Sequence, residues 1–180
     1  MFYVSSLCSL MLTCFRTKQK FLYGENNPYW FNQAKTLVDL LMENKVEESQ
    51  SLIGTMLKEF LSVRNSGSEF YYYGFMSGVL GLACAAKSIE FHEEIERGDG
   101  FSDIILDNFD AETVCILELK TTKELDDCFA VAQSATEQIV KKDYAARFIT
   151  RRYKKVYGLG IGFAKKGCEI VSLGNLVKNS

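Results

Sequence analysis

Three charged residues near the middle of the chain have the types and spacing of a site for metal-assisted hydrolysis. Asp103 precedes one short apolar run, and Glu118 and Lys120 end a second, with polar residues 107–113 between the two runs. This pattern predicts a β-hairpin. Because side chains in a strand alternate between faces, Glu118 and Lys120 are expected to point the same way. The hairpin then brings Asp103 to the same end of the strand pair.

This set of side chains suits a phosphodiester substrate. Two carboxylates are the hard oxygen ligands that Mg²⁺ prefers, and Mg²⁺ keeps several waters, which leaves room for a phosphate. A lysine beside the ion can orient the attacking water and stabilise charge in the transition state. The residues alone leave a plainer alternative open, in which the two carboxylates end strands and Lys120 forms a surface ion pair worth under about 1 kcal/mol.

Four sequence blocks around these residues resemble one family. The blocks are E-F-Y-x-x-G-F-x-x-G at residues 69–78, E-x-G-D-G-x-x-D at 96–103, I-L-E-L-K at 116–120 and E-Q-I-x-K-K-x-Y at 137–144. In this order they resemble the PD-(D/E)XK nuclease superfamily, in the form found at the C-terminus of many predicted AAA-type ATPases. The resemblance covers residues 66–173.

The resemblance implies a fold and a site. The fold is α/β, a restriction-endonuclease-like core of order α-β-β-β-α-β-β with a mixed sheet flanked by helices, behind a helical N-terminal extension. The implied catalytic residues are Asp103, Glu118, Lys120 and Gln138, and the implied ligands of Mg²⁺ or Mn²⁺ are Asp103, Glu118 and Glu69. The residues themselves leave open that Glu69 only caps a helix and that Gln138 lies on a helix surface.

The activity implied by the resemblance is Mg²⁺-dependent hydrolysis of phosphodiester bonds in DNA or RNA. The alternative is a catalytically silent nucleic-acid-binding or protein-interaction module associated with an AAA-type ATPase. No P-loop motif is present, and G-L-G-I-G at residues 158–162 lacks the spacing of a nucleotide-binding loop. Its glycines are expected to let a helix pack closely on the sheet.

Charge is distributed unevenly along the chain. Residues 90–127 contain thirteen acidic and three basic side chains, whereas residues 141–166 contain nine basic and one acidic. Cations interleaved with aromatic rings are typical of surfaces that bind a polyanion. The candidate nucleic-acid contacts are Lys141, Lys142, Tyr144, Arg151 and Arg152. A solvated helix end is the alternative.

Hydrophobic periodicity predicts the remaining elements. Helices are expected on either side of a polar break at residues 43–50, over residues 66–87 and over residues 123–149, and further strands at residues 88–97, 156–164 and 168–173. We expect residues 1–63 to form an apolar segment and helical extension, a remnant of a longer ATPase architecture, and residues 64–180 to form the nuclease-like domain. The first two helices suit a link to an ATPase or a local cap on the sheet.

Composition bears on the redox compartment, on metal binding by histidine and on membrane insertion. The six cysteines lack C-x-x-C spacing and are expected to be buried free thiols in a reducing compartment, which predicts a cytoplasmic protein. The single histidine, His92, excludes a histidine-rich metal site and is expected to be solvated or hydrogen-bonded rather than catalytic. The apolar stretches at residues 1–15 and 70–86 are too short for a typical membrane span. Nucleic acid is the expected partner, with an ATPase as a possible second partner or parent protein.

Overall fold

The computed structural model describes residues 28–60, 69–93, 104–149 and 153–177. The elements in these ranges are α2 (Tyr29–Met42), α3 (Val46–Phe60), α4 (Glu69–Ala86), β1 (Glu90–Glu93), β2 (Ile104–Asn108), β3 (Thr113–Thr121), a 3₁₀ turn (Leu125–Asp127), α5 (Cys128–Lys141), α6 (Ala146–Ile149), β4 (Lys155–Ala164) and β5 (Gly167–Asn175). From α4 onward the order of the main elements is α-β-β-β-α-β-β, which confirms the predicted core.

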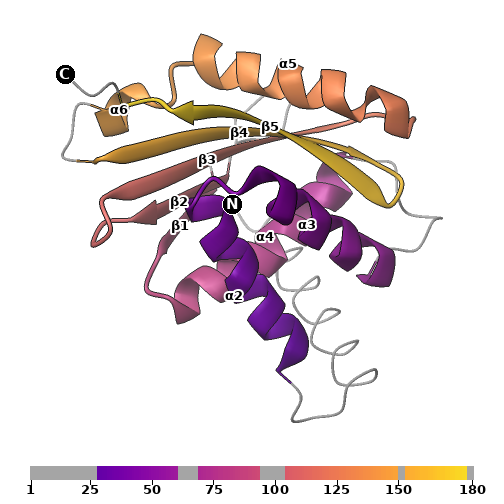
Figure 1. Cartoon of the computed structure of the whole chain (residues 1–180), viewed down its shortest axis with the longest axis horizontal. Coiled ribbons are helices and arrows are strands. Elements are labelled where there is room, and N and C mark those ends of the chain that lie inside the picture. The colour runs from indigo at the N-terminus through magenta and orange to yellow at the C-terminus, as the bar shows by residue number, and fades with distance from the viewer. Residues whose placement is uncertain (1–27, 61–68, 94–103, 150–152, 178–180) are drawn as a thin grey trace.

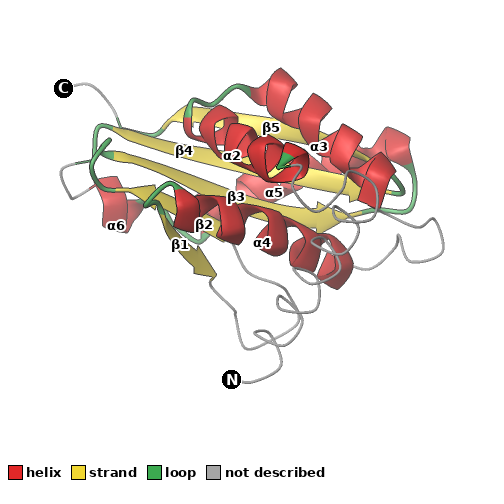
Figure 2. Ribbon diagram, turned by 90° about the horizontal axis from the view of Figure 1, so that it is seen from below, coloured by secondary structure: helices red, strands yellow, loops and turns green. Residues whose placement is uncertain are grey.

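The strands form one mixed sheet of order β1-β2-β3-β4-β5. The pairs β1–β2, β2–β3 and β4–β5 are antiparallel, whereas β3 and β4 are parallel. Parallel neighbours need a crossover connection, and α5 provides it. Helix α5 covers one face of the sheet, and α2, α3 and α4 cover the other, which gives three layers (Figures 1 and 2).

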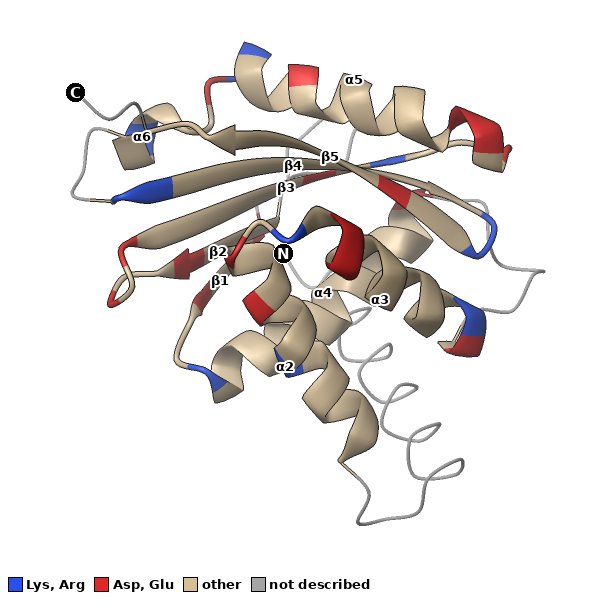
Figure 3. Ribbon diagram, in the orientation of Figure 1, with Lys and Arg blue, Asp and Glu red and all other residues tan. Residues whose placement is uncertain are grey.

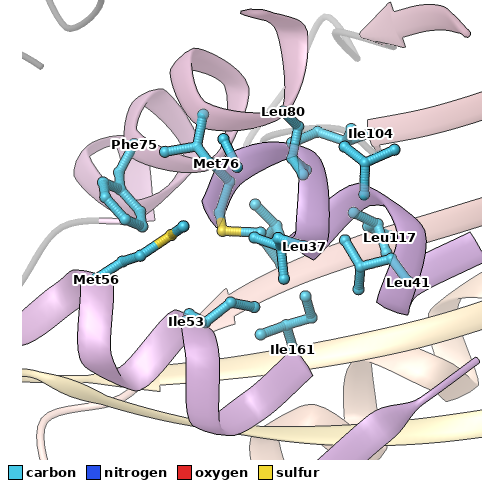
Figure 4. Packing of buried hydrophobic residues seen from close by; sticks show 14 of the residues in the cluster. Leu37, Leu41, Ile53, Met56, Phe75, Met76, Leu80, Ile104, Leu117 and Ile161 are labelled. Atoms are coloured by element: carbon cyan, nitrogen blue, oxygen red, sulfur yellow. The ribbon is translucent and has the colours of Figure 1, made fainter. Parts of the chain in front are cut away.

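The larger hydrophobic cluster fills the space between the sheet and helices α2, α3 and α4. Figure 4 shows Leu37 of α2, Ile53 of α3 and Met76 of α4 directed toward Leu117 and Ile161 of the sheet. All five side chains are fully buried. Burial of each such side chain contributes about 1.5–3 kcal/mol, so α2 and α3 are integral to this core.

A smaller cluster lies on the other face of the sheet, beneath α5 and α6. Ile105 of β2 and Ile116 of β3 belong to it, together with Ile139 of α5 and Phe148 of α6. Alternation along β3 explains the division, because Leu117 and Leu119 belong to the larger cluster. Glu118, between these two leucines, therefore points toward α5, and so does Lys120.

The prediction of one continuous helix over residues 123–149 is wrong. A 3₁₀ turn precedes α5, and a four-residue turn separates α5 from α6. Asp143 in this turn has φ 51°, a left-handed conformation that an α-helix does not contain. The Tyr144 amide donates back to the Ile139 carbonyl and closes the end of α5. The apolar periodicity of α5 and α6 concealed this interruption.

The predicted turn of the hairpin is also too long. Asp107 belongs to β2 and is paired with Val114 of β3. Its side chain is buried, and the Tyr153 hydroxyl offsets the cost of burial by donating to both carboxylate oxygens, at 2.6 and 2.7 Å. The polar break between the first two helices is likewise shorter than predicted, since α3 begins at Val46.

Four of the six cysteines lie in the described ranges, and all four are buried free thiols, namely Cys84, Cys115, Cys128 and Cys168. Burial raises the pKa of the Cys84 thiol to about 12 and that of Cys115 still further. The prediction of buried thiols is confirmed for these four residues. Cys8 and Cys14 lie outside the described residues.

The apolar stretch at residues 70–86 forms most of α4, which packs into the larger cluster. No helix in the described part of the chain is long and apolar enough to cross a membrane. The apolar stretch at residues 1–15 and the expected boundary between residues 63 and 64 lie outside the described ranges, so the predicted domain division stays a prediction.

Two glycines of β4 allow the α5 backbone to approach the sheet. A Cβ atom at Gly160 would overlap the Ala132 carbonyl oxygen, and one at Gly162 would overlap the Cys128 carbonyl oxygen. The expectation that these glycines permit close helix packing is confirmed. They also lie opposite Glu118 and Lys120 in the parallel pair of β3 and β4.

The substitution Gly160→Ala is expected to destabilise the fold. The added methyl group must displace the backbone of α5, which costs about 1–3 kcal/mol of unfolding free energy. Gly54→Ala in α3 is the matched control, because a Cβ there meets no atom within 4 Å and alanine favours a helix by up to about 1 kcal/mol. Urea denaturation of both variants measures the difference, and equal midpoints would contradict the packing described.

Candidate functional site

The sheet places Glu118 and Lys120 next to each other on its α5 face. Glu118 lies opposite Gly160 and Lys120 opposite Gly162. Because these partners lack side chains, the Glu118 carboxylate and the Lys120 ammonium are the only functional groups that this part of the β3–β4 pair presents to α5. Glu118 is only 1% exposed, whereas Lys120 is half-buried near the end of the strand.

Helix α5 fixes the Lys120 ammonium. Lys120 Nζ donates to Ser134 Oγ at 3.1 Å and to the Ser134 carbonyl at 3.4 Å. This contact depends on the close approach of α5 over the glycines of β4, because Ser134 is carried by the same helix. Both acceptors are neutral oxygens, and an ammonium has three N–H donors, so one donor is left for a further partner.

The Glu118 carboxylate is buried without a full set of hydrogen bonds. Its Oε2 atom has no hydrogen-bond partner among the residues that the structure describes. Leaving a buried acceptor unsatisfied costs about 1–3 kcal/mol, and more when the group is charged. A divalent cation at this oxygen would remove the cost, so the donor chemistry of Glu118 fits a metal ligand.

Gln138 lies one helical turn after Ser134 on α5. Residues four apart share a helix face, and both side chains are half-buried at the edge of the contact with the sheet. Gln138 is therefore on the side of α5 that contacts Lys120. Sequence reasoning selected Gln138 and missed Ser134, although the spacing of the two residues in one helix was a usable signal.

Asp103 lies outside the described residues. Its sequence neighbour Ile104 is paired with Leu117, the residue before Glu118. The predicted hairpin is confirmed for residues 104–121, and the place of Asp103 beside Glu118 stays a prediction.

Glu69 is the first residue of α4, on the face of the sheet opposite to α5. Tyr72, one turn later, stacks on Phe163 of β4 with ring centroids 4.8 Å apart. Phe163 lies opposite Thr121, the residue after Lys120. Helix α4 thus begins at the same end of the sheet as Lys120 but on its other face. The role of Glu69 as a metal ligand stays a prediction.

The described candidate nucleic-acid residues lie at the C-terminal end of α5 and just after it. Lys141 is exposed, and Lys142 Nζ lies 5.4 Å from the centre of the Tyr144 ring. Lys142 is eight residues after Ser134, or roughly 12 Å along the helix axis. Figure 3 shows basic residues, in blue, at the end of α5 that leads to α6. Arg151 and Arg152 lie outside the described residues.

A second group of charged side chains occupies the same face of the sheet. Potential metal-ligating atoms of Glu90, His92 and Asp107 all lie within 4.8 Å of one another. His92 Nε2 is 3.3 Å from a Glu90 carboxylate oxygen. Asp107 is paired with Val114, four residues before Glu118, so this group is a separate feature about 13 Å away along β3.

Comparison with models of known protein families identifies the superfamily of the chain. The model of the PD-(D/E)XK nuclease superfamily matches residues 67–173, which is more than half of the chain. The chain belongs to the PD-(D/E)XK nuclease superfamily. No curated protein and no solved structure matches it.

Membership in the PD-(D/E)XK superfamily agrees with the geometry described above. The match runs from just before α4 into β5, so it includes α5 and nearly all of the sheet but not α2 or α3. The fold is the restriction-endonuclease-like fold of this superfamily. Nucleases of the superfamily usually use divalent metal ions, and the buried carboxylate of Glu118 fits that requirement.

The substitution Glu118→Gln is expected to stabilise the protein when no metal is present. The amide keeps the shape of the side chain and removes a buried charge, which should raise the free energy of unfolding by about 1 kcal/mol or more. Urea denaturation at pH 8 in EDTA measures the change. Glu137→Gln, on the exposed side of α5, is the control and should change little. A loss of stability in Glu118→Gln would mean that the carboxylate has a stabilising partner.

Proposed function

We propose that the chain is a metal-dependent nuclease that hydrolyses phosphodiester bonds of DNA or RNA. Asp103, Glu118, Lys120 and Gln138 are the proposed catalytic residues. The observation that best supports the proposal is the buried Glu118 carboxylate, whose Oε2 lacks a described hydrogen-bond partner, beside an ammonium that α5 holds in place. Family membership supports the same class of reaction.

The proposed ligands of Mg²⁺ or Mn²⁺ are Asp103 and Glu118, with Glu69 as a third candidate. When bound, the ion supplies Lewis acidity to a phosphoryl oxygen and lowers the pKa of a bound water. Glu118 suits this task because a buried carboxylate gains more from a cation than an exposed one does. Its neighbours Gly160 and Gly162 present no competing side chain on the same face.

Lys120 is proposed to act on the attacking water and on the phosphate. Its ammonium can donate a hydrogen bond to the attacking water and offset the negative charge that develops on the phosphate oxygens. Two of its three protons are directed to oxygens of Ser134, which leaves one donor for the water or the phosphate. Gln138, one turn further along α5, offers an amide that can position the water or the substrate.

The basic end of α5 is the proposed nucleic-acid contact. Lys141, Lys142 and Tyr144, together with Arg151 and Arg152, would neutralise backbone phosphates and offer a ring for base stacking. Lys142 lies roughly 12 Å along the helix axis from Ser134, the residue that contacts Lys120. One strand that passes Lys120 could therefore also reach the basic residues.

Cleavage of labelled DNA and RNA oligonucleotides tests the proposal. Asp103→Asn, Glu118→Gln and Lys120→Ala are each expected to lower the Mg²⁺-dependent rate by about 100-fold or more, because each removes a charge that acts in the transition state. Lys123→Ala, an exposed residue three positions after Lys120, is the control and should cleave as the wild type does.

Other outcomes of the same assay are equally informative. Cleavage at the wild-type rate by all three variants would exclude this site from catalysis. Binding of oligonucleotides in EDTA with no cleavage in Mg²⁺ or Mn²⁺ would support the silent binding module instead. Association with an ATPase stays a prediction that this assay does not address.

The contact between Ser134 and Lys120 leads to a separate expectation. Ser134→Ala removes the Oγ acceptor at 3.1 Å and lets the ammonium sample other positions, so cleavage should fall about tenfold, equivalent to about 1.4 kcal/mol. Ser134→Thr retains a hydroxyl and should recover most of the rate. Gln133→Ala, an exposed neighbour on α5, should have no effect. If Ser134→Ala and Ser134→Thr have the same rate, the hydroxyl does not position Lys120.

A further inference from the structure

The edge of the sheet carries a group of three potential metal ligands that the proposed nuclease site does not use. Glu90 and His92 are two residues apart on β1, so their side chains point to one face. Asp107 of β2 lies directly opposite Glu90, and Ile105 lies opposite His92. The ligating atoms of the three side chains lie within 4.8 Å of one another, close enough to contact one ion.

The charges of this group favour a divalent cation. Two carboxylates and a neutral imidazole carry a net charge of −2. In the described part of the chain, no lysine or arginine forms an ion pair with Glu90 or Asp107. The titratable partner of Glu90 in the described ranges is His92, with Nε2 and Oε2 3.3 Å apart. A divalent ion would neutralise both carboxylates and accept the imidazole lone pair.

Asp107 is the anchor of the group. It is 7% exposed, and its described hydrogen-bond partner is the neutral hydroxyl of Tyr153, at 2.6 and 2.7 Å from the two carboxylate oxygens. Tyr153 is itself buried and packs edge-on against Phe148. Carboxylates that ligate metal ions are commonly oriented in this way by a hydrogen-bond donor.

We propose that Glu90, His92 and Asp107 form a second metal site, suited to Zn²⁺. A nitrogen and two oxygen donors match the ligand preferences of Zn²⁺, and three protein ligands leave a fourth position for water. Mg²⁺ has little affinity for imidazole, so the site would differ in metal preference from the proposed centre at Glu118. The two sites are about 13 Å apart along β3.

The proposed ion would tie the edge strand to the sheet. Strand β1 has four residues, and among the described strands it pairs with β2 alone. Two of the ligands come from β1 and one from β2, so binding would cross-link the strands in addition to their backbone hydrogen bonds. Zn²⁺ should therefore stabilise the folded protein even when the nuclease centre is disabled.

Because His92 is the chain's single histidine, its imidazole is a direct probe of the site. Zn²⁺ is titrated into full-length ¹⁵N-labelled Glu118→Gln protein, with a reducing agent present, while the imidazole ¹⁵N resonances are recorded. Saturable shifts are expected at Nε2, with one equivalent of Zn²⁺ bound. The buried thiols are poor competitors, since burial raises the pKa of Cys84, Cys115, Cys128 and Cys168.

Two variants decide the assignment. Glu90→Gln, on the exposed edge strand, and His92→Ala, measured by calorimetry, are each expected to weaken Zn²⁺ binding at least tenfold. Glu47→Gln, exposed on α3, is the control and should bind as the parent does. Unshifted imidazole resonances in excess Zn²⁺, or equal affinity in both variants and the parent, would overturn the proposal. Neither result would bear on the nuclease centre, because every protein in this experiment carries Glu118→Gln.

Discussion

The contact between the α5 backbone and the glycines of β4 is the constraint on which the proposed site depends. Gly160 and Gly162 let carbonyl oxygens of α5 lie where side chains would otherwise stand. This approach brings Ser134 within 3.1 Å of the Lys120 ammonium. The same glycines lie opposite Glu118 and Lys120 across the parallel strand pair, so the neighbouring strand cannot compete for either charge. The close packing of α5 and the absence of competing side chains opposite Glu118 and Lys120 therefore have one cause.

The two faces of the sheet differ in the kind of side chain that they bury. The face under α2, α3 and α4 is covered by a continuous apolar cluster, which supplies most of the stabilising burial. Among the described residues, the buried charged side chains are Asp107 and Glu118, and both lie on the α5 face. A buried carboxylate lowers stability unless it is paired. The apolar face offsets this cost, and the division leaves the α5 face free for chemistry.

Local pattern was enough to predict the parts of the site that lie close together in sequence. The hairpin, and the common direction of Glu118 and Lys120, follow from a period of two residues. The motif blocks selected Gln138, which lies on α5, and its role stays a prediction. Contacts between segments that are far apart in the sequence could not be predicted from local residue spacing. Ser134 meets Lys120 only through the crossover of α5, and Asp107 meets Tyr153 across 46 residues. The break at Asp143 was hidden because apolar spacing continued through it.

The two buried carboxylates differ in how far the sequence could predict them. Both are among the thirteen acidic residues within residues 90–127. The I-L-E-L-K block selected Glu118, whereas Asp107 was predicted to lie in the polar turn of the hairpin. Their environments differ after folding, because Asp107 accepts hydrogen bonds from the Tyr153 hydroxyl whereas Oε2 of Glu118 has no partner in the described ranges. Demand for a cation is thus a property of the packed sheet rather than of the acid itself. It is strongest where apolar neighbours exclude water and the facing strand offers only glycine.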